Sequence, residues 1–493
     1  MKNFPKINFY NEGEALAFSD VYLKPSYSDI KSRYSNQIDT STEVAKGAPK
    51  LNIPFISSGM DTVTGEKMAE VMSLNGGLGE IHRNNTPSQQ AEMVRIVKEK
   101  MRTIETNPPM VSVKAKISDA LNLLEKRNRG YVLVFKGDKF EGNICGIATN
   151  KDFNAGNNET LISKVMTSVT GNGIRKLITA KDGTSLTQAV KIMRDFRIEK
   201  LPVLDKANVL LGVYTLKDYE LINRYPNAAT DNLGRLIVGA AIGVHEVDVE
   251  RALLVVEAGV DVIFLDIAHG HSVYTKEMIR KLKVKENIKI PIIVGNIATY
   301  DGALFAYEAG ADGIKVGIGP GFVCKTRNVA GTGVPQITAV LEVSRALKNI
   351  KKALPIISDG GVREPGDPSK AIACGADTVM IGSLFAGTDM SPGDTVRING
   401  TLQKRVRGMA SKGVLEDRKK ISSTSTNITV YAPEGRETFT PYQGSTQELL
   451  MEYVGGLRSA MSYTGSHSIS ELKKANLIHV SGYGSNEQGR PLA

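Results

Sequence analysis

The chain has few cysteines and no long hydrophobic run. Its three cysteines, Cys145, Cys324 and Cys374, are too few and too scattered for a disulfide framework or a zinc site. No apolar segment approaches the roughly 18 residues of a membrane span. Residues 1–5 lack the apolar core of a signal peptide, and residues 490–493 match no address signal. We therefore expect a cytoplasmic protein without membrane association, in which the cysteines stay reduced.

Basic residues are spread along the chain and are not gathered into runs. The formal net charge is +10 at pH 7, but this pattern gives no reason to expect a specific nucleic acid partner. Small anionic ligands such as nucleotides fit equally well, and a solvated surface explains most of the charge. Hydrophobic content of 41% and charged content of 23% describe an ordinary globular protein. At 493 residues it is long enough for more than one domain.

A glycine-rich stretch that leads to a cysteine, residues 315–327, is the centre of the sequence. The apolar run before Gly317 predicts the end of a buried strand, and the glycines that follow let backbone approach a ligand. Free N–H groups in such a loop can hold a phosphate. Cys324 precedes the cations Lys325 and Arg327, which favours the reactive thiolate. The alternative is a small buried hydrophobic residue, and the loop matches neither the dinucleotide fingerprint nor the Walker pattern.

Residues 102–222 contain their own repeat. The octapeptide at 146–153 returns at 212–219, and an amphipathic helix is predicted before each copy, at 117–126 and 186–194. The segment resembles a pair of cystathionine-β-synthase (CBS) modules inserted into a larger domain.

That resemblance implies a regulatory site for adenine or guanine nucleotides. In CBS modules the Gly-apolar-apolar-Thr-x-x-Asp element contacts the ribose of the nucleotide. The residues that match are Thr149, Asp152, Thr215 and Asp218. The alternative is that these residues cap the following helices, and both roles are compatible.

Residues 1–101 and 223–493 show a different repeat, a helix end with a Gly-x-Asp stop followed by an apolar strand. It occurs at 257–266, 308–317 and 373–382. Apolar strands that alternate with helices predict a parallel sheet covered on both faces. Roughly eight such units fit, so we expect an α/β fold of the (β/α)8 (TIM) barrel type with the CBS pair inserted.

In a barrel of this type the active site lies where strands end. The predicted strand ends bring together Ser58, Asp266, Asn296, the loop 317–326, Asp359, Gly382 and Ser383. The last two strands end at the place where such barrels commonly hold phosphate.

The segment 405–445 departs from the barrel pattern. Residues 421–430 are rich in Ser, Thr and Asn, and a long polar segment of this kind is usually a functional lid or disordered. We expect a mobile flap here. Glu434 at its end, taken alone, is most simply a solvated carboxylate.

The motifs together resemble the IMP dehydrogenase/GMP reductase family over essentially the whole chain. They are residues 58–64, 266–272, 295–299, 317–327, 358–361 and 382–388. The resemblance implies that Cys324 attacks C2 of a purine nucleotide and that a nicotinamide cofactor exchanges hydride there.

The resemblance also implies roles for other residues. Thr326, Glu434 and Arg418 would act with Cys324 in catalysis. Substrate would bind to Ser58, Met60, Asp359, Gly360, Gly361, Gly382, Ser383, Gly408 and Met409. Asp266, Asn296 and Gly317 would border the cofactor, and the carbonyls of Gly319, Gly321 and Cys324 would bind a monovalent cation, typically K+. The family forms homotetramers that CBS modules can pair into octamers.

Two branches of the family differ in how the adduct is resolved. Dehydrogenases oxidise IMP with NAD+ and hydrolyse the XMP adduct, using an Arg-Tyr pair on the flap. Here Arg418 is followed by Lys419, so the tyrosine is absent. Reductases convert GMP to IMP with NADPH and release ammonia, for which a Thr and a Glu supply protons.

We expect a GMP reductase. Residues 408–412, 229–236 and 32–33 resemble CBS-bearing bacterial GMP reductases, while 382–388 and 456–465 are equally similar to dehydrogenases, so IMP dehydrogenase is the alternative. A third hypothesis is a non-catalytic nucleotide sensor, against which intact Cys324 and Thr326 argue. Phe322 and Val406 stand where dehydrogenases usually have Ser and Tyr, which changes the expected phosphate contacts.

Overall fold

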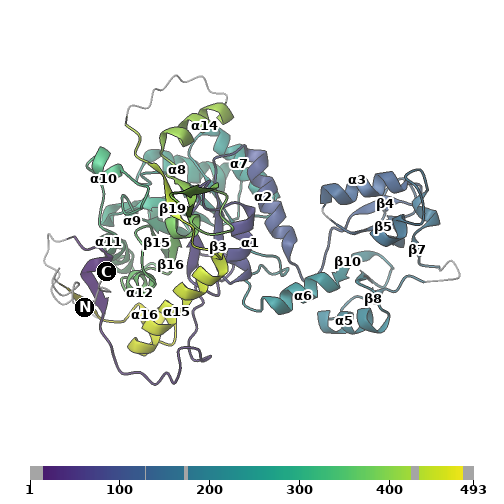
Figure 1. The fold of residues 1–493 in the computed structure, drawn as a ribbon, viewed down its shortest axis with the longest axis horizontal. Helices are drawn as coiled ribbons and strands as arrows, with labels where there is room; N and C mark the ends of the chain where they lie inside the picture. The colour runs from purple at the N-terminus through teal and green to yellow at the C-terminus, as the bar shows by residue number, and fades with distance from the viewer. Residues whose placement is uncertain (1–14, 128, 171–175, 423–431, 481–493) are drawn as a thin grey trace. The chain divides into compact units, whose positions relative to one another are not determined.

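The computed structural model describes residues 15–127, 129–170, 176–422 and 432–480. The expectations for residues 1–5 and 490–493, and part of the predicted flap (423–431), lie outside these ranges. Contacts divide the chain into two compact units, residues 1–100 with 227–493 and residues 101–226. Figure 1 shows both units.

The first unit is built on a closed barrel of parallel strands, which confirms the predicted (β/α)8 fold. The neighbours in order are β11 (Gly239–Ile242), β12 (Val262–Asp266), β13 (Ile292–Ile297), β14 (Gly313–Val316), β15 (Ile356–Asp359), β16 (Thr378–Ile381), β2 (Phe55–Ser57) and β3 (Leu78–Ile81). Strand β3 then pairs with β11 and closes the ring. Because all strands run in one direction, their carboxyl ends meet at one face.

Helices alternate with these strands. They are α1 (Glu66–Leu74), α2 (Pro87–Lys100), α7 (Glu246–Glu257), α8 (Val273–Arg280), α9 (Tyr300–Glu308), α11 (Gln336–Asn349) and α12 (Asp367–Ala373). The glycines predicted to stop three of them, Gly259, Gly310 and Gly375, have φ of 91°, 92° and 122°. This is the left-handed region that glycine enters without a steric penalty. The long helix α15 (Thr446–Thr464) begins at Ser445, whose hydroxyl accepts from the Glu448 N–H.

Side chains from different strands fill the base of the barrel. Ile56, Leu78, Phe264, Ile357 and Met380 belong to one buried cluster and are at most 1% exposed. Burial of this apolar area, worth about 1.5–3 kcal/mol for each large side chain, fixes the register that aligns the strand ends.

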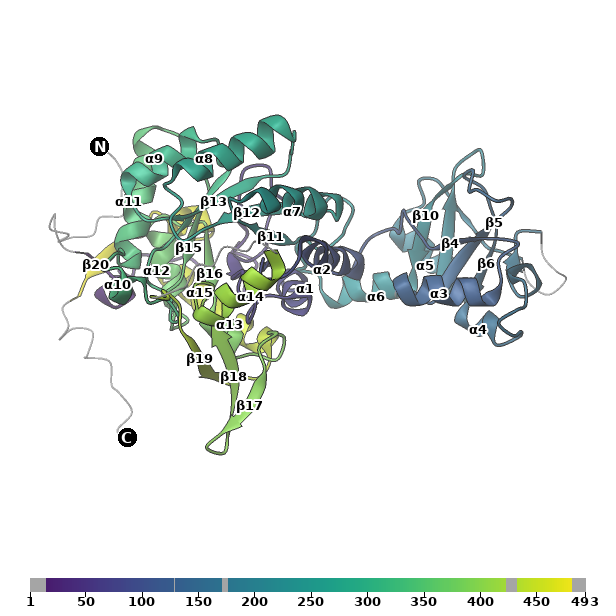
Figure 2. The ribbon, with the colours of Figure 1, turned by 90° about the horizontal axis from the view of Figure 1, so that it is seen from above.

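The predicted flap, residues 405–445, is more regular than expected and belongs to a larger substructure that begins at residue 395. It forms an antiparallel sheet of β17 (Thr395–Ile398), β18 (Thr401–Arg407) and β19 (Glu437–Pro441), with α14 (Lys412–Ser422) between the last two strands. Val406 and Val414 are fully buried, so tertiary packing orders a stretch that is polar in sequence. Figure 2 shows this sheet extending from the barrel.

Short elements complete the first unit. They are η1 (Phe18–Asp20), β1 (Val21–Leu23) paired with β20 (Leu477–His479), a π-helix (Lys281–Lys285), α10 (Thr326–Val329), α13 (Ser383–Ala386) and α16 (Ile469–Leu472).

The second unit repeats one motif. The first copy contains β4 (Met110–Ser112), α3 (Ile117–Arg127), β5 (Tyr131–Phe135), β6 (Ile144–Thr149), α4 (Asn150–Phe153), η2 (Ile162–Lys164) and β7 (Thr167–Ser168). The second contains β8 (Ala180–Lys181), α5 (Leu186–Asp195), β9 (Lys200–Leu204), β10 (Leu210–Thr215) and α6 (Leu216–Arg224). In each copy an antiparallel strand pair ends at the Thr of the repeated octapeptide and a helix follows.

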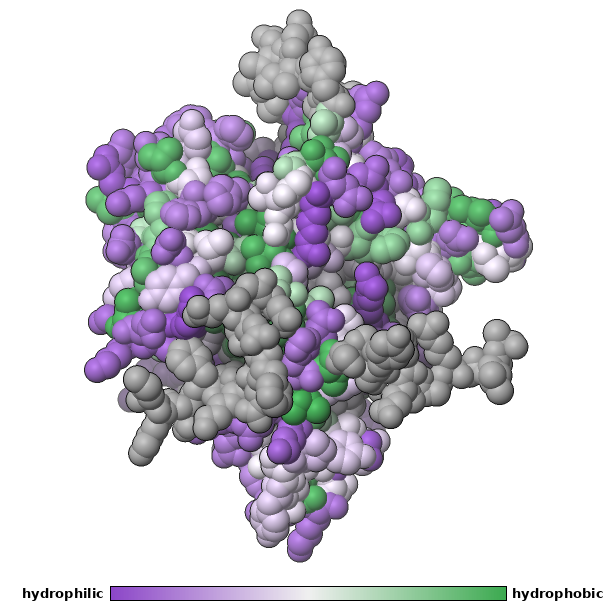
Figure 3. Space-filling view, turned by 90° about the vertical axis from the view of Figure 1, so that its left-hand side faces the viewer, coloured by the Kyte–Doolittle hydropathy of each residue, from purple (hydrophilic) through white to green (hydrophobic). Residues whose placement is uncertain are grey.

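Hydrophobic residues on the face shown in Figure 3 stand in small groups between hydrophilic ones. Among the described residues, none of the helices combines the length and apolarity needed to cross a membrane.

Candidate active site

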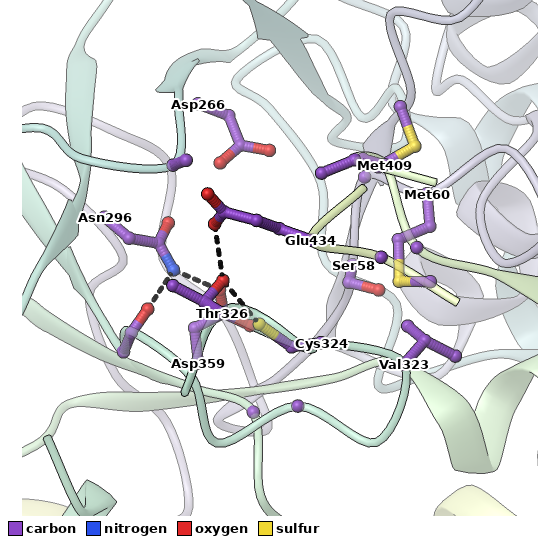
Figure 4. Close-up of a pocket in the computed structure, with 18 of the residues that line it drawn as sticks. Ser58, Met60, Asp266, Asn296, Val323, Cys324, Thr326, Asp359, Met409 and Glu434 are labelled. Atoms are coloured by element: carbon purple, nitrogen blue, oxygen red, sulfur yellow. Dashed lines mark hydrogen bonds between the residues drawn. The ribbon is translucent and has the colours of Figure 1, made fainter. Parts of the chain in front are cut away.

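A cavity of about 360 Å3 opens at the carboxyl ends of the barrel strands. It brings together most of the residues singled out in the sequence. Those that line it are Ser58, Met60, Asp266, Asn296, Gly317, Gly319, Gly321, Cys324, Thr326, Asp359, Gly360, Gly408, Met409, Arg418 and Glu434. Figure 4 shows ten of the lining residues by name.

Gly361, Gly382 and Ser383 do not line this cavity but lie beside it. A Cβ on Gly382 would stand 3.0 Å from the Ser58 hydroxyl oxygen, and one on Gly361 would stand 3.3 Å from Pro320. Ser383 is the first residue of α13.

Cys324, Thr326 and Glu434 form a continuous hydrogen-bonded row (Figure 4). The thiol sulfur of Cys324 lies 3.1 Å from the Thr326 hydroxyl oxygen. That hydroxyl donates to the Glu434 carboxylate at 2.9 Å. A hydroxyl carries one proton, so when Thr326 donates to Glu434 the thiol is the donor to Thr326. The row can therefore move a proton between the sulfur and the carboxylate.

Backbone contacts hold the two ends of this row together. The Lys325 N–H donates to the Glu434 carbonyl at 2.6 Å, and the Arg436 N–H donates to the Val323 carbonyl at 2.9 Å. A β-bridge joins Cys324 to Gly435. The segment that precedes β19 thus lies against the loop that follows β14, and Glu434 reaches a site far from it in sequence.

One of the two cations that follow Cys324, Arg327, contacts the loop backbone. The Arg327 guanidinium donates to the Val334 carbonyl at 2.7 Å and packs against Gly319 and Gly333. Arg327 therefore braces the loop, and the polar neighbour of the sulfur is the neutral Thr326 hydroxyl.

A buried lysine connects three strand ends. The Lys315 ammonium lies 2.7 Å from Asp266 and 3.2 Å from Asp359. Burial alone would lower the pKa of Lys315, but the two carboxylates outweigh it and raise that pKa above its ordinary value. Burial alone would raise the pKa of Asp266, but Lys315 holds it below its ordinary value. The pair therefore stays ionised at neutral pH.

Glu80 lies beneath this group, fully buried on β3. Its burial, with Asp266 and Asp359 nearby, raises its pKa well above the ordinary range, against the opposing effect of Lys315. The Gly59 N–H donates to one carboxyl oxygen at 3.2 Å, and the other oxygen has no hydrogen-bond partner among the described residues. We interpret Glu80 as an uncharged acid.

Helix α14 carries Arg418 into the cavity. Burial, followed by repulsion from Arg83, lowers the pKa of Arg418 to about 10, against the attraction of Asp266. Arg83 itself donates to the Asp266 carbonyl at 3.1 Å. Arg407 holds the middle of the helix, since its guanidinium lies 2.9 Å from Asp417 and 2.5 Å from Asp61.

Sequence reasoning missed the roles of Lys315, Arg83 and Glu80. A signal was present for two of them, because Lys315 and Glu80 are charged residues within otherwise apolar strand segments. Such residues are almost never fully buried unless they have a partner. Arg83 follows β3 by two residues and carried no comparable signal.

Asn296 offers an acceptor that suits a cofactor amide. Its side-chain nitrogen donates to the Gly317 carbonyl at 2.6 Å and to Asp359 at 2.8 Å. Its oxygen is buried without a partner among the described residues. The carboxamide N–H of a nicotinamide would satisfy this oxygen, so the site fits such a cofactor.

The three residues predicted to bind a monovalent cation, Gly319, Gly321 and Cys324, lie on the loop after β14. The Gly321 carbonyl accepts from the Cys324 N–H at 3.1 Å, which places both residues in one tight turn. Gly319, with φ of 89°, lies just before it. The binding of K+ by the carbonyls of these three residues stays a prediction.

In the second unit the predicted Thr–Asp pairs both serve as helix caps. Thr149 donates from N–H and hydroxyl to the Asp152 carboxylate, each at 2.7 Å. Thr215 donates to Asp218 at 2.6 Å and accepts from its N–H at 3.1 Å. Burial raises the pKa of Asp218 above its ordinary value. The capping alternative is therefore confirmed, and the ribose role stays a prediction.

Comparison with known proteins agrees with this site. The model of the IMP dehydrogenase / GMP reductase domain matches residues 15–490. The inosine-5'-monophosphate dehydrogenase of Aquifex aeolicus is 41% identical over 96% of this chain and 94% of its own. The GMP reductase of Leishmania donovani is 39% identical over 97% and 96%. A crystal structure of a Trypanosoma brucei GMP reductase variant with guanosine 5'-monophosphate superposes with a TM-score of 0.86 at 36% identity, covering 98% of this chain and 100% of that one.

Fold and site together define a (β/α)8-barrel purine nucleotide oxidoreductase. The chain belongs to the IMP dehydrogenase/GMP reductase family.

Proposed function

We propose that this protein is an NADPH-dependent GMP reductase that converts GMP to IMP and ammonia. The Cys324–Thr326–Glu434 row supplies the nucleophile and the proton donor that reductive deamination needs, and the same Thr and Glu occur in many dehydrogenases, so the residue that follows Arg418 carries the choice of branch. The absence of a tyrosine after Arg418 supports the reductase, since the dehydrogenase reaction requires activated water.

The row would act in two steps. First, the Cys324 thiol gives its proton through Thr326 to Glu434, and the thiolate adds to C2 of the purine. Second, the same proton returns through Thr326 to the 2-amino group, which leaves as ammonia while the sulfur–C2 bond remains. A bound nicotinamide cofactor would supply the hydride that C2 needs, and the sulfur would then depart.

The surrounding residues would hold the reactants. Met409 and Gly408 line the wall shared with Glu434, where the base would sit. Asp266 and Asn296 would face the cofactor, and the turn of Gly319, Gly321 and Cys324 would hold K+ and thereby fix the nucleophile loop.

IMP dehydrogenase is the second candidate, favoured by Arg418. This guanidinium lines the cavity, and burial lowers its pKa to about 10, which moves it toward the range of a general base. Relatives named as dehydrogenases are also as similar to the chain as those named as reductases.

We further propose that the second unit is a CBS pair that binds regulatory adenine or guanine nucleotides, and that the chain assembles as a homotetramer or octamer. The repeated strand–strand–helix motif with its Thr–Asp caps supports the first proposal. A cytoplasmic location suits these substrates.

The test is absorbance at 340 nm in two parallel assays with K+ present. GMP with NADPH should give falling absorbance and released ammonia. Rising absorbance with IMP and NAD+, and no reaction with GMP, would contradict the reductase and favour the dehydrogenase.

A further inference from the structure

Glycines in the loops after the last two barrel strands, β15 and β16, form a cradle beside the cavity. Gly360 and Gly361 follow β15 with φ of 89° and 84°, and Gly382 precedes the short helix α13. In (β/α)8 barrels these two loops and such a helix commonly bind phosphate. The purine nucleotide of the proposed function carries a phosphate that this cradle could receive.

Ser58 points to a missing ligand at the same place. It is 7% exposed, and its hydroxyl has no hydrogen-bond partner among the described residues. The hydroxyl oxygen lies 3.0 Å from the position of a Cβ on Gly382, so it is next to the cradle. A buried polar atom normally has a partner, and a phosphate oxygen would supply one.

The three glycines of the cradle carry no charge to match a phosphate dianion. Two cations are candidates: the exposed Arg363, two residues after Gly361, and Arg436, which lies over Phe322. Phe322 is 47% exposed although its chain neighbours Gly321 and Val323 both line the cavity. The Arg436 guanidinium lies over its ring, 5.2 Å from the ring centre. The ring thus supports the cation at the cavity rim.

Arg436 is also fixed through its backbone. Its N–H donates to the Val323 carbonyl at 2.9 Å, and its carbonyl accepts from the Gly408 N–H at 3.0 Å. On the other side, the Gly321 nitrogen lies 3.4 Å from the position of a Cβ on Gly360. Phe322 therefore directly follows the residue that lies against the cradle.

We propose that Arg436, supported by Phe322, is the cationic contact for the phosphate of the substrate nucleotide. This inference rests on the proposed function and adds a binding residue to it. The planar guanidinium can donate two hydrogen bonds to phosphate oxygens. Neither Phe322 nor the fully buried Val406 carries a hydroxyl, so neither side chain can donate a hydrogen bond to the phosphate. The guanidinium of Arg436 would donate hydrogen bonds to the phosphate in their place.

The experiment compares GMP and guanosine binding, by calorimetry, to the wild type, Arg436→Gln and Arg397→Gln. Arg397 is a matched control on β17, whose guanidinium donates to the Gly400 carbonyl. We expect Arg436→Gln to weaken GMP binding about 10- to 100-fold, as for loss of a charged hydrogen bond, with guanosine unaffected. In turnover, KM for GMP should rise while kcat changes little, and Arg436→Lys should restore part of the affinity.

Two further readouts separate charge from structure. Phosphate becomes a dianion near pH 6, so wild-type affinity for GMP should increase between about pH 5 and 7, and less so in Arg436→Gln. Adding Phe322→Ser to Arg436→Gln offers a neutral donor and should recover part of the binding.

Each outcome bears on the inference. Equal GMP affinity in wild type and Arg436→Gln overturns it and leaves the proposed function intact. Parallel loss of guanosine and GMP binding also overturns it, since that would mean a structural role. A wild-type protein that binds neither GMP nor IMP overturns both the inference and the proposed function.

Discussion

The hydroxyl of Thr326 donates to the carboxylate of Glu434 across 108 positions of sequence, at 2.9 Å. Thr326 starts a short helix after the nucleophile loop, and Glu434 precedes β19 of the sheet that extends from the barrel. Because the same hydroxyl lies 3.1 Å from the Cys324 sulfur, the hydrogen-bonded row of these three side chains forms only when this segment lies against the barrel.

Removing the acid from this row should slow the chemistry without preventing binding. Glu434→Gln keeps the size of the side chain but cannot take the thiol proton. We expect kcat for GMP reduction to fall by about 10²–10⁴, the usual contribution of a general acid or base. Single-turnover kinetics measure the step.

Glu437→Gln is the control, since Glu437 pairs with Arg405 on the same sheet and lies outside the cavity lining. A Glu434→Gln enzyme with unchanged kcat would remove Glu434 from the relay.

Replacing the nucleophile should abolish turnover and leave nucleotide binding intact. In Cys324→Ala the sulfur–C2 bond cannot form, while the lining residues remain. Iodoacetamide should label Cys324 in the wild type, and GMP should protect it. Cys145→Ala, a change in the second unit, should retain full activity. Residual turnover in Cys324→Ala would contradict covalent catalysis.

Arg418→Ala distinguishes the two branches of the family. In a reductase no water is activated, so kcat should change little, whereas a dehydrogenase should lose about 10²–10⁴ of its rate. Steady-state kinetics in both assay directions test this. Lys412→Ala, an exposed change on the same helix, corrects for general effects on α14. A large loss in GMP reduction would mean that Arg418 takes part in the reductase reaction as well.

The sequence predicted those features of the fold that depend on a local pattern of residues, such as helix ends and buried strands. Helix stops at Gly259, Gly310 and Gly375 and the apolar strands after them follow from backbone conformation and burial, so the barrel and its strand-end site could be inferred. Helix α14 could not, because its order comes from contacts such as Arg407 with Asp417 and from the burial of Val414.

Side-chain contacts between segments that lie far apart in the sequence could not be predicted either. Lys315 meets Asp266 from 49 positions away, and Arg436 meets Phe322 across two separate loops. No periodicity encodes such contacts. Glu434 entered the predicted site only through resemblance to a family, since its local sequence suggested an exposed loop.

The last prediction concerns pH. His82 is buried beside the cavity, and its Nδ1 accepts from the Asn84 N–H at 3.1 Å. Burial outweighs the attraction of Asp61 and, with repulsion from Arg251, lowers its pKa from 6.5 to about 4. Between these values the unfolded chain binds a proton that the folded protein does not, so the free energy of unfolding should decrease as pH falls from 6.5 to 4.

The expected loss is about 3 kcal/mol at most, from the size of the shift. His82→Asn keeps an acceptor for the Asn84 N–H but does not titrate. Its melting temperature relative to that of the wild type should therefore rise as the pH is lowered from 6.5 to 4. The exposed His467, paired with Asp29, has a raised pKa and gives the opposite sign, since it stabilises the fold at low pH. His467→Asn should therefore lower the relative melting temperature as pH falls to 6.5 from above, and change it little between pH 6.5 and 4, where both the folded and the unfolded chain are protonated at this position. If His82→Asn leaves the acid side of the profile unchanged, His82 is already protonated in the fold and Asp61 outweighs burial.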